Sequence, residues 1–324
     1  MSGFSNCSFG TCALFLDGIL LGFRPSTVQQ VNELKATLLQ AGQQTVRVLN
    51  GNVQAAIAES IASRNLIISS KNNALSALAG NVYVWSKTSI AYAENNDHSV
   101  RSPILQFGAD IAVGSSKALG VSLGYGDLNQ SSGTTSIDGL QVTLQPYFGW
   151  QHGSWQGTAS VTYGQVDYDT ITFASGTASA KGDLIAFSAD ASKGILLRNG
   201  KTLSPVASFS VGSIDLTETA GSLAGAGFAK SVSLQDARFG TRLSQKIGSS
   251  GIVTFGISAD YSHSNAPVNL ISGRFNNKGW SGTAETGYQV ELKNGMNINA
   301  QLVAGGLGSS SKQNTGSVEI GMQF

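Results

Sequence analysis

Residues 140–150 read LQVTLQPYFGW, and apolar and polar side chains alternate along most of this stretch. Successive side chains of a β-strand point to opposite faces of the sheet, so alternation predicts a strand with one apolar face. The apolar face carries Leu140, Val142, Leu144, Phe148 and Trp150, and the opposite face carries Gln141, Thr143, Gln145 and Gly149. The stretch therefore indicates a strand that separates an apolar environment from a polar one.

The same period of two returns from about residue 81 to the end of the sequence. Twelve segments show it, and they begin near residues 82, 102, 118, 139, 155, 183, 201, 229, 252, 278, 296 and 315. Segments that follow one another this closely predict antiparallel pairing, because parallel neighbours need a long crossover connection. The sequence thus predicts an all-β protein with twelve antiparallel strands.

The connections between the segments fall into two classes. Every second connection is short: SSK at 115–117, HGS at 152–154, RNGK at 198–201, GSSG at 248–251 and KNG at 293–295. Two of these contain Asn-Gly, the pair that favours tight hairpin turns. The others tend to be longer and rich in Ser, Thr, Gly and Asn: 129–138, 170–182, 218–228 and 264–277. Short turns at one end and long loops at the other are typical of a transmembrane outer-membrane β-barrel.

Composition indicates which face of the strands meets lipid. Only 12% of the residues are charged and the net charge is +1, so a nucleic-acid partner is not expected. A water-facing surface usually carries about 25–35% charged residues, so the Gly, Ser, Thr, Asn and Gln of the polar faces suit a confined wet lumen better. Aromatic residues near strand ends, expected as interfacial girdles, are Trp85, Tyr125, Trp150, Trp155, Tyr261 and Trp280. We therefore expect apolar side chains on the outside, against outer-membrane lipid.

The segment at 234–247, LQDARFGTRLSQKI, supports the same sidedness with its charges. Arg or Lys on the lipid face near the bilayer midplane costs about 2–4 kcal/mol, so its charges should face the lumen. Six charged residues are predicted to face the lumen, either on this basis or by the alternation of their own segments: Asp110, Asp236, Arg238, Arg242, Lys246 and Glu285.

The last strand, GSVEIGMQF, ends on an aromatic residue. Its apolar face carries Val318, Ile320, Met322 and Phe324. An unpaired strand edge is a template for aggregation. We therefore expect this strand to pair with the first one and close the barrel.

Three zones are predicted along the chain: an irregular stub at 1–25, a helical linker and pore plug at 26–80, and the barrel at 81–324. The stub resembles neither a membrane-spanning helix nor a signal peptide, because its apolar run is short and lacks the flanking signals. Helical spacing links Val28, Val31, Leu34 and Leu38. The helix is polar on most sides and should be broken or bent by NGN at 50–52. About 20 helical residues rise roughly 30 Å, enough to thread the lumen.

No residue pattern predicts catalysis, a cofactor or a metal site. Cys7 and Cys12 are either plain thiols or a local disulfide, the latter favoured if the protein is exported. Three histidines are present, His98, His152 and His263, and we interpret the Asp97–His98 pair as part of a solvated loop. Nucleophile-elbow, phosphate-loop and zinc motifs are missing from the sequence.

Several stretches together resemble the C-terminal translocator domain of monomeric autotransporters, the type V secretion family. LQFGADIAVGSSKALGVSLGYG at 105–126 is similar to the second and third strands of that domain. LQPYFGW and ARFGTRL are similar to its fourth and eighth strands, and the terminal VEIGMQF resembles the signal read by the barrel assembly machinery. The resemblance covers about residues 26–324.

The resemblance implies a monomeric, non-enzymatic outer-membrane anchor of a Gram-negative bacterium that exports its own N-terminal passenger. The C-terminus would then be periplasmic, the long loops extracellular, and residues 1–25 the remains of the passenger. Self-cleavage at Asn32 is a minor alternative, because Glu33 stands where the self-cleaving members have a second asparagine. A stand-alone porin-like channel and an outer-membrane surface hydrolase remain as alternative functions.

Overall fold

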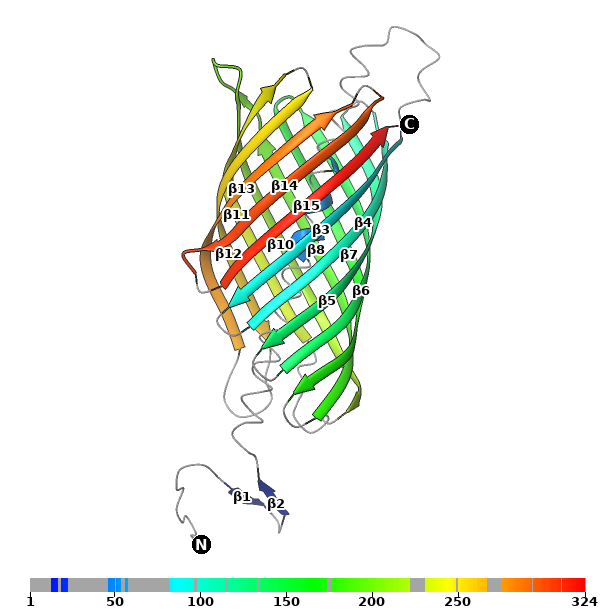
Figure 1. The fold of residues 1–324 in the computed structure, drawn as a ribbon, viewed down its shortest axis with the longest axis vertical. Coiled ribbons are helices and arrows are strands. Elements are labelled where there is room, and N and C mark those ends of the chain that lie inside the picture. The colour runs from blue at the N-terminus through cyan, green and yellow to red at the C-terminus, as the bar shows by residue number, and fades with distance from the viewer. Residues whose placement is uncertain are drawn as a thin grey trace.

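The computed structural model describes residues 13–16, 19–22, 46–49, 51–53, 56–57, 82–95, 98–114, 116–132, 135–173, 176–221, 231–248, 250–266, 275–292, 294–309 and 311–323. In this part of the chain, twelve long antiparallel strands close into one barrel with a short helix inside it (Figure 1). The predicted fold class is confirmed.

The barrel strands follow the order of the sequence. They are β3 (Val82–Asn95), β4 (His98–Ala112), β5 (Lys117–Ser132), β6 (Thr135–His152), β7 (Trp155–Phe173), β8 (Gly176–Lys193), β10 (Thr202–Gly221), β11 (Ser231–Ile247), β12 (Gly251–Ala266), β13 (Phe275–Glu291), β14 (Met296–Leu307) and β15 (Ser311–Gln323). The two-residue β9 (Ile195–Leu196) pairs with the start of β10. Each long strand is hydrogen-bonded to its neighbours in sequence, and β15 pairs with β3.

The pairing of β15 with β3 closes the cylinder along thirteen register positions, from Ser311 opposite Asn95 to Gln323 opposite Tyr83. The last strand therefore has a partner on each side, as the sequence predicted. Closure removes the exposed strand edges that an open sheet would present.

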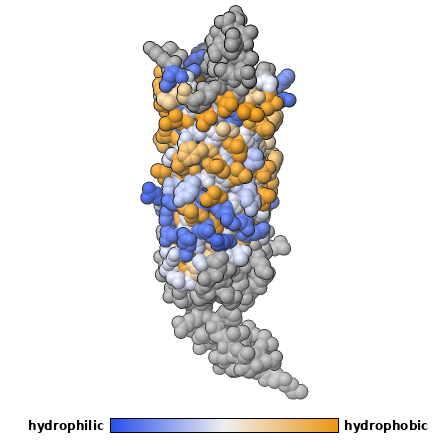
Figure 2. Space-filling model, turned by 90° about the vertical axis from the view of Figure 1, so that its right-hand side faces the viewer, coloured by the Kyte–Doolittle hydropathy of each residue, from blue (hydrophilic) through white to orange (hydrophobic). Residues whose placement is uncertain are grey.

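The outer surface carries the apolar side chains. On β5 the exposed residues Leu119, Val121, Leu123 and Tyr125 lie between Lys117 and Asp127. Ten residues span about 33 Å along a strand, or roughly 25 Å across a membrane when the strand is tilted by about 40°. Figure 2 shows an apolar band with a hydrophilic zone on one side of it. This is the sidedness of a lipid-facing wall.

The two ends of the barrel differ, and we call them the turn end and the loop end. The turn end holds the five short connections that were predicted, and each contains a glycine with positive φ: Gly114, Gly153, Gly200, Gly248 and Gly295. Left-handed φ favours glycine because it has no Cβ, which explains why these sequences turn tightly. The loop end has two longer connections, 222–230 and 267–274, beside four short ones.

The loop end corrects two predictions. The segments 129–138 and 170–182, expected as long loops, are mostly strand: β5 and β6 pair up to Ser132 opposite Thr135, and β7 and β8 up to Phe173 opposite Gly176. Antiparallel pairing satisfies backbone hydrogen bonds whatever the side chains, so polar composition alone does not end a strand. Of the other two expected loops, 218–228 and 264–277, residues 222–228 and 267–274 lie outside the described residues, and the rest belong to strands.

The N-terminal region differs from its prediction in two respects. The stub contains a hairpin, β1 (Ala13–Leu16) with β2 (Ile19–Gly22), and the intervening sequence is Asp17-Gly18, a pair that tight turns favour. Of the expected break or bend at 50–52, Gly51 and Asn52 are helical, whereas Asn50 lies outside the described residues. Tertiary contacts made by the helix outweigh the low helix propensity of both residue types.

No helix in the described ranges is long and apolar enough to cross a membrane.

Candidate functional site

The helical residues 46–49, 51–53 and 56–57 lie inside the barrel. Val53, Ala56 and Ile57 pack in one buried cluster with Tyr83 and with two further inward-facing aromatic residues, Trp85 and Tyr147. Tyr83 and Trp85 stand at the turn end of β3, so this end of the helix lies near the turn end. The wall has a recess for it, because a Cβ on Gly149 would lie 2.2 Å from Ile57 Cγ2.

The other end of the helix lies toward the loop end. Val46 packs in a second buried cluster with Val100 and Ile137, which belong to the loop-end halves of β4 and β6. The helix therefore runs from the loop end to the turn end as residue numbers rise, and Figure 1 shows it within the cylinder.

Asn52 fixes the helix to the wall through a chain of buried amides and hydroxyls. Its Nδ2 donates to Gln106 Oε1 at 2.9 Å, and its Oδ1 accepts from Ser89 Oγ at 3.1 Å. Gln106 Nε2 donates in turn to Gln145 Oε1 at 3.1 Å, and Gln145 Nε2 donates to Ser160 Oγ at 3.1 Å. A buried polar network of this kind is rigid when its members are satisfied. It specifies one depth and one rotation for the helix.

Trp85 corrects one aromatic prediction. It was expected in the interfacial girdle, but it faces the lumen at 1% exposure, and its Nε1 donates to Tyr147 OH at 2.9 Å. Tyr147 OH donates to Asp110 Oδ2 at 3.2 Å, so Asp110 faces the lumen as predicted. Gly108 lies opposite Trp85 in register, and a Cβ there would be 2.3 Å from the indole ring. Because Gly108 has no side chain, the indole ring of Trp85 fits inside the lumen.

The other aromatic residues stay on or near the outer surface. Tyr125, Trp155 and Trp280 are exposed. Trp155 lies under the ammonium group of Lys193, whose Nζ is 5.4 Å from the ring centroid. Their positions agree with the predicted girdles.

Arg47 links the helix to the opposite wall. It is hydrogen-bonded to Asp236 and Ser262, and its Nη1 donates to Gln313 Oε1 at 2.6 Å. Asp236 was predicted to face the lumen, but Arg47 was not singled out as its partner. The signal was in the sequence, because Arg47 is the only charged residue between Lys35 and Glu59. An isolated charge on an otherwise uncharged stretch of helix needs a partner in a confined lumen.

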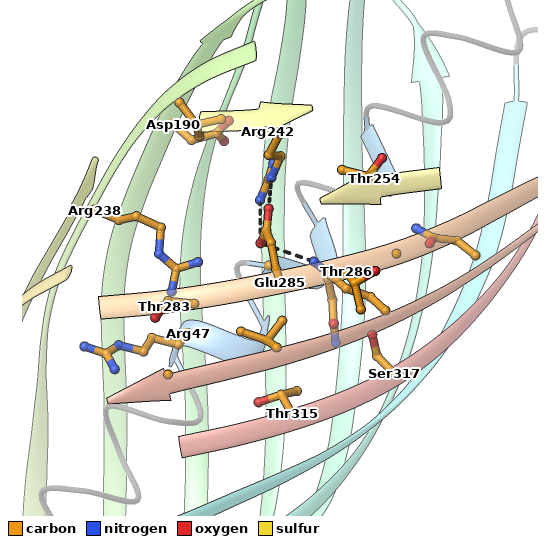
Figure 3. A pocket seen from close by; sticks show the side chains of 18 of the residues that line it. Arg47, Asp190, Arg238, Arg242, Thr254, Thr283, Glu285, Thr286, Thr315 and Ser317 are labelled. Carbon is orange, nitrogen blue, oxygen red and sulfur yellow. Dashed lines mark hydrogen bonds and ion pairs between the residues drawn. The ribbon is translucent and has the colours of Figure 1, made fainter. Parts of the chain in front are cut away.

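Two of the predicted inward charges on β11, Arg238 and Arg242, are paired with carboxylates on the following strands. Arg238 makes a two-point contact with Asp260, with Nε to Oδ1 at 2.7 Å and Nη2 to Oδ2 at 3.3 Å. Arg242 contacts Glu285 in the same forked way, as Figure 3 shows. Such bidentate pairs hold guanidinium groups in one orientation. Lys246 is exposed next to the turn after β11, and by alternation it lies on the same face of the strand as Arg238 and Arg242.

A cavity of about 320 Å³ lies beside the helix, along the wall from β7 to β15. Arg47, Asp190, Arg242 and Glu285 line it together with many Ser, Thr, Asn and Gln side chains (Figure 3). The helix thus packs closely against β3–β6 and leaves polar space on its other side. Asp190, which accepts a hydrogen bond from Thr158, was not predicted as part of this site.

The remaining predicted residues are placed as follows. Val318 and Ile320 are exposed on the outer face of β15, and Met322 follows on the same face. Phe324, Cys7, Cys12 and Asn32 lie outside the described residues.

His98 begins β4, His152 is exposed at the turn end, and His263 lies in β12. Within the described ranges, no group of three or more His, Cys, Asp or Glu residues is placed to hold a metal ion.

Comparisons with known proteins agree on the barrel. A family model described as "Autotransporter beta-domain" matches residues 84–267. Among solved structures, the translocator domain of autotransporter NalP from Neisseria meningitidis is similar over 87% of this chain and 98% of that chain, with a TM-score of 0.63 and 14% identity. A search of curated proteins finds no sequence match.

Two further structures show the same arrangement. The β-domain of the Bordetella autotransporter BrkA covers 75% of this chain and 100% of its own length, with a TM-score of 0.57 and 15% identity. The transport unit of the autotransporter AIDA-I from Escherichia coli covers 82% and 98%, with a TM-score of 0.57 and 13% identity. At such low identity these likenesses show the fold alone.

Proposed function

Because the chain belongs to the autotransporter β-domain family, we propose that it exports an N-terminal passenger to the cell surface through the barrel described above. The family implies a translocator domain in the outer membrane of a Gram-negative bacterium. The export step rests on one observation above all: the direction of the helix in the lumen. Val46 lies toward the loop end, and Ile57 lies toward the turn end, where β3 begins.

The direction of the helix also supports an orientation in the membrane. Short turns face the periplasm in known outer-membrane barrels, and longer connections face outward. In this orientation the C-terminus is periplasmic, the loop end is extracellular, and anything attached upstream of the helix emerges outside the cell. Residues 26–80 then act as linker and pore plug, and residues 81–324 as the anchor.

The remaining parts of the proposal concern partners and chemistry. The outer face of β15, with Val318 and Ile320 exposed, is the surface offered to the barrel assembly machinery and later to lipid. The described lumen is occupied by paired charges and amides that hold the helix, a role in anchoring rather than catalysis. We propose a monomeric, non-enzymatic translocator without a cofactor.

The test is surface display in a Gram-negative host. A signal peptide and a protease-sensitive reporter are fused upstream of Met1, and intact cells are treated with an external protease. Cleavage of the reporter in intact cells is expected, together with a heat-modifiable barrel in the outer membrane. A reporter that stays in the periplasm while the barrel assembles normally would contradict export. Open-porin conductance of the full chain would instead favour the channel function.

A further inference from the structure

The barrel wall reverses its sidedness on the loop-end side of the apolar band. Within the band, β5 carries Tyr125 outside, whereas beyond the band the same strand carries Asp127 outside and buries Leu128 inside. On β10, Asp215 is exposed and Leu216 is buried. Charge outside and apolar side chains inside are the arrangement of a water-soluble wall. This part of the barrel therefore extends beyond the lipid.

The hydrophilic side of this extension forms a belt of exposed or half-exposed charges on β5–β10. Its members are Asp127, Asp138, Asp167, Lys181, Asp183 and Asp215. Lys181 Nζ lies 3.3 Å from Asp167 Oδ1, across the β7–β8 pair. A charged belt of this kind is costly in hydrocarbon, so it marks where water begins.

The inner side of the extension forms a buried apolar cluster that we call the collar. Its members include Leu128, Ile137, Ile171, Leu216 and Leu234 of the wall, and Val46 of the helix belongs to the same cluster. Each of these side chains is at most 7% exposed. Strands β5, β6, β7, β10 and β11 supply the wall residues, so the collar surrounds the end of the described helix on several sides.

The polar cavity and the collar meet between two consecutive residues. Arg47 lines the cavity of about 320 Å³, whereas Val46 is buried in the collar. The lumen is thus divided lengthwise into a polar portion that contains the Arg238 and Arg242 ion pairs and an apolar portion at the loop end. Water has many hydrogen-bond partners in the first portion, whereas the side chains of the second are apolar except for the Tyr168 hydroxyl.

We propose that the collar, closed around Val46, is the ion barrier of the resting pore. Hydrophobic constrictions block conduction by excluding water, and an ion that enters one loses its hydration without gaining polar ligands. Ions from the turn end then reach the level of Arg47 and stop there. The barrier follows from the wall and the helix themselves, so it holds whether or not the chain exports a passenger.

The first experiment compares two serine variants on one strand in planar lipid bilayers. Leu128→Ser places a hydroxyl in the collar, and Leu123→Ser makes the same change on the lipid face of β5. We expect a several-fold rise in single-channel conductance for Leu128→Ser and no change for Leu123→Ser. Equal conductance of Leu128→Ser and the unmodified protein, with both barrels heat-modifiable, would overturn the proposal.

The second experiment measures where water reaches, and it decides the matter alone if Leu128→Ser fails to assemble. In a Cys7→Ser/Cys12→Ser background, Ser244→Cys reports on the cavity and Leu216→Cys reports on the collar. A charged thiol reagent is supplied to both sides of the reconstituted full-length protein. Fast labelling at position 244 and protection at position 216 are expected. Labelling at similar rates would mean that the collar is wet and the barrier lies elsewhere.

Discussion

Lys87 and Glu319 stand directly opposite each other where β3 meets β15, and Lys87 Nζ lies 3.3 Å from Glu319 Oε2. Both side chains are almost completely buried, with exposures of 2% and 0%. Among the described long strands, this is the one pairing between strands that are not neighbours in sequence. A shift of the seam by two residues would separate the two charges inside the wall. The ion pair therefore favours one register of closure.

Removal of one member of this pair should destabilise the barrel strongly. An uncompensated buried charge typically costs about 3–5 kcal/mol, whereas replacement of both partners by apolar residues is often neutral. We expect Lys87→Met to lower the temperature at which the barrel loses its folded mobility on gels, and Lys87→Met/Glu319→Leu to restore most of it. Thr88→Ala, on the exposed face of β3, is the control. A double variant no better than Lys87→Met would contradict this role.

The recess at Gly149 should control how the helix sits. A Cβ at this position would collide with Ile57 Cγ2 at 2.2 Å, and overpacking of this kind typically costs about 1–3 kcal/mol. Gly149→Ala should make the helix more sensitive to added protease in detergent solution. Ile57→Ala should rescue it in the double variant, because the collision disappears. Unchanged proteolysis in Gly149→Ala would show that the helix does not depend on this recess.

Arg47 and Asp236 should be energetically coupled. The two side chains are 18% and 12% exposed, and neighbours within one polar network usually show coupling of about 0.5–3 kcal/mol. Arg47→Ala, Asp236→Asn and the double variant form a cycle that can be measured by urea unfolding in detergent. We expect the double variant to lose less than the sum of the single losses. Strict additivity would mean that the contact does not hold the helix.

The terminal residue should affect assembly rather than the lumen. Deletion of Phe324 shortens the alternating apolar face that includes Val318 and Ile320, so recognition of the last strand should weaken. Pulse-labelled cells should then accumulate heat-modifiable barrel more slowly, while the conductance of barrels that do form stays the same. Normal insertion kinetics in the truncated protein would argue against a signal at this end.

Much of the barrel was predictable because lipid and lumen impose opposite chemistry on alternate residues. Gln106 faces inward and Phe107 outward on β4, in the order that their alternation predicted. The short turns were predictable for a related reason: Gly200 and Gly295 follow asparagines, and both adopt the positive φ that such turns require. These signals are local, so one sequence suffices to read them.

The features that were missed depend on contacts between distant residues. Trp85 turns inward because Gly108 on the neighbouring strand leaves space for its ring, which single-strand periodicity does not reveal. The loop-end hairpins were expected as loops because their polar outer faces resemble loop composition, while Leu128 and Ile137 bury on the inside. Arg47 was overlooked because its partners are more than 180 residues away, on β11 and beyond.

The seam between β3 and β15 also has a kinetic consequence. Every other neighbouring pair of long strands is a hairpin, so the wall can zip up from local contacts at little entropic cost. Joining the first strand to the last means bringing together residues more than two hundred positions apart, such as Lys87 and Glu319. That single long-range step should be the slowest in folding. Until it is complete, the sheet has two free borders to which another unfinished molecule can attach.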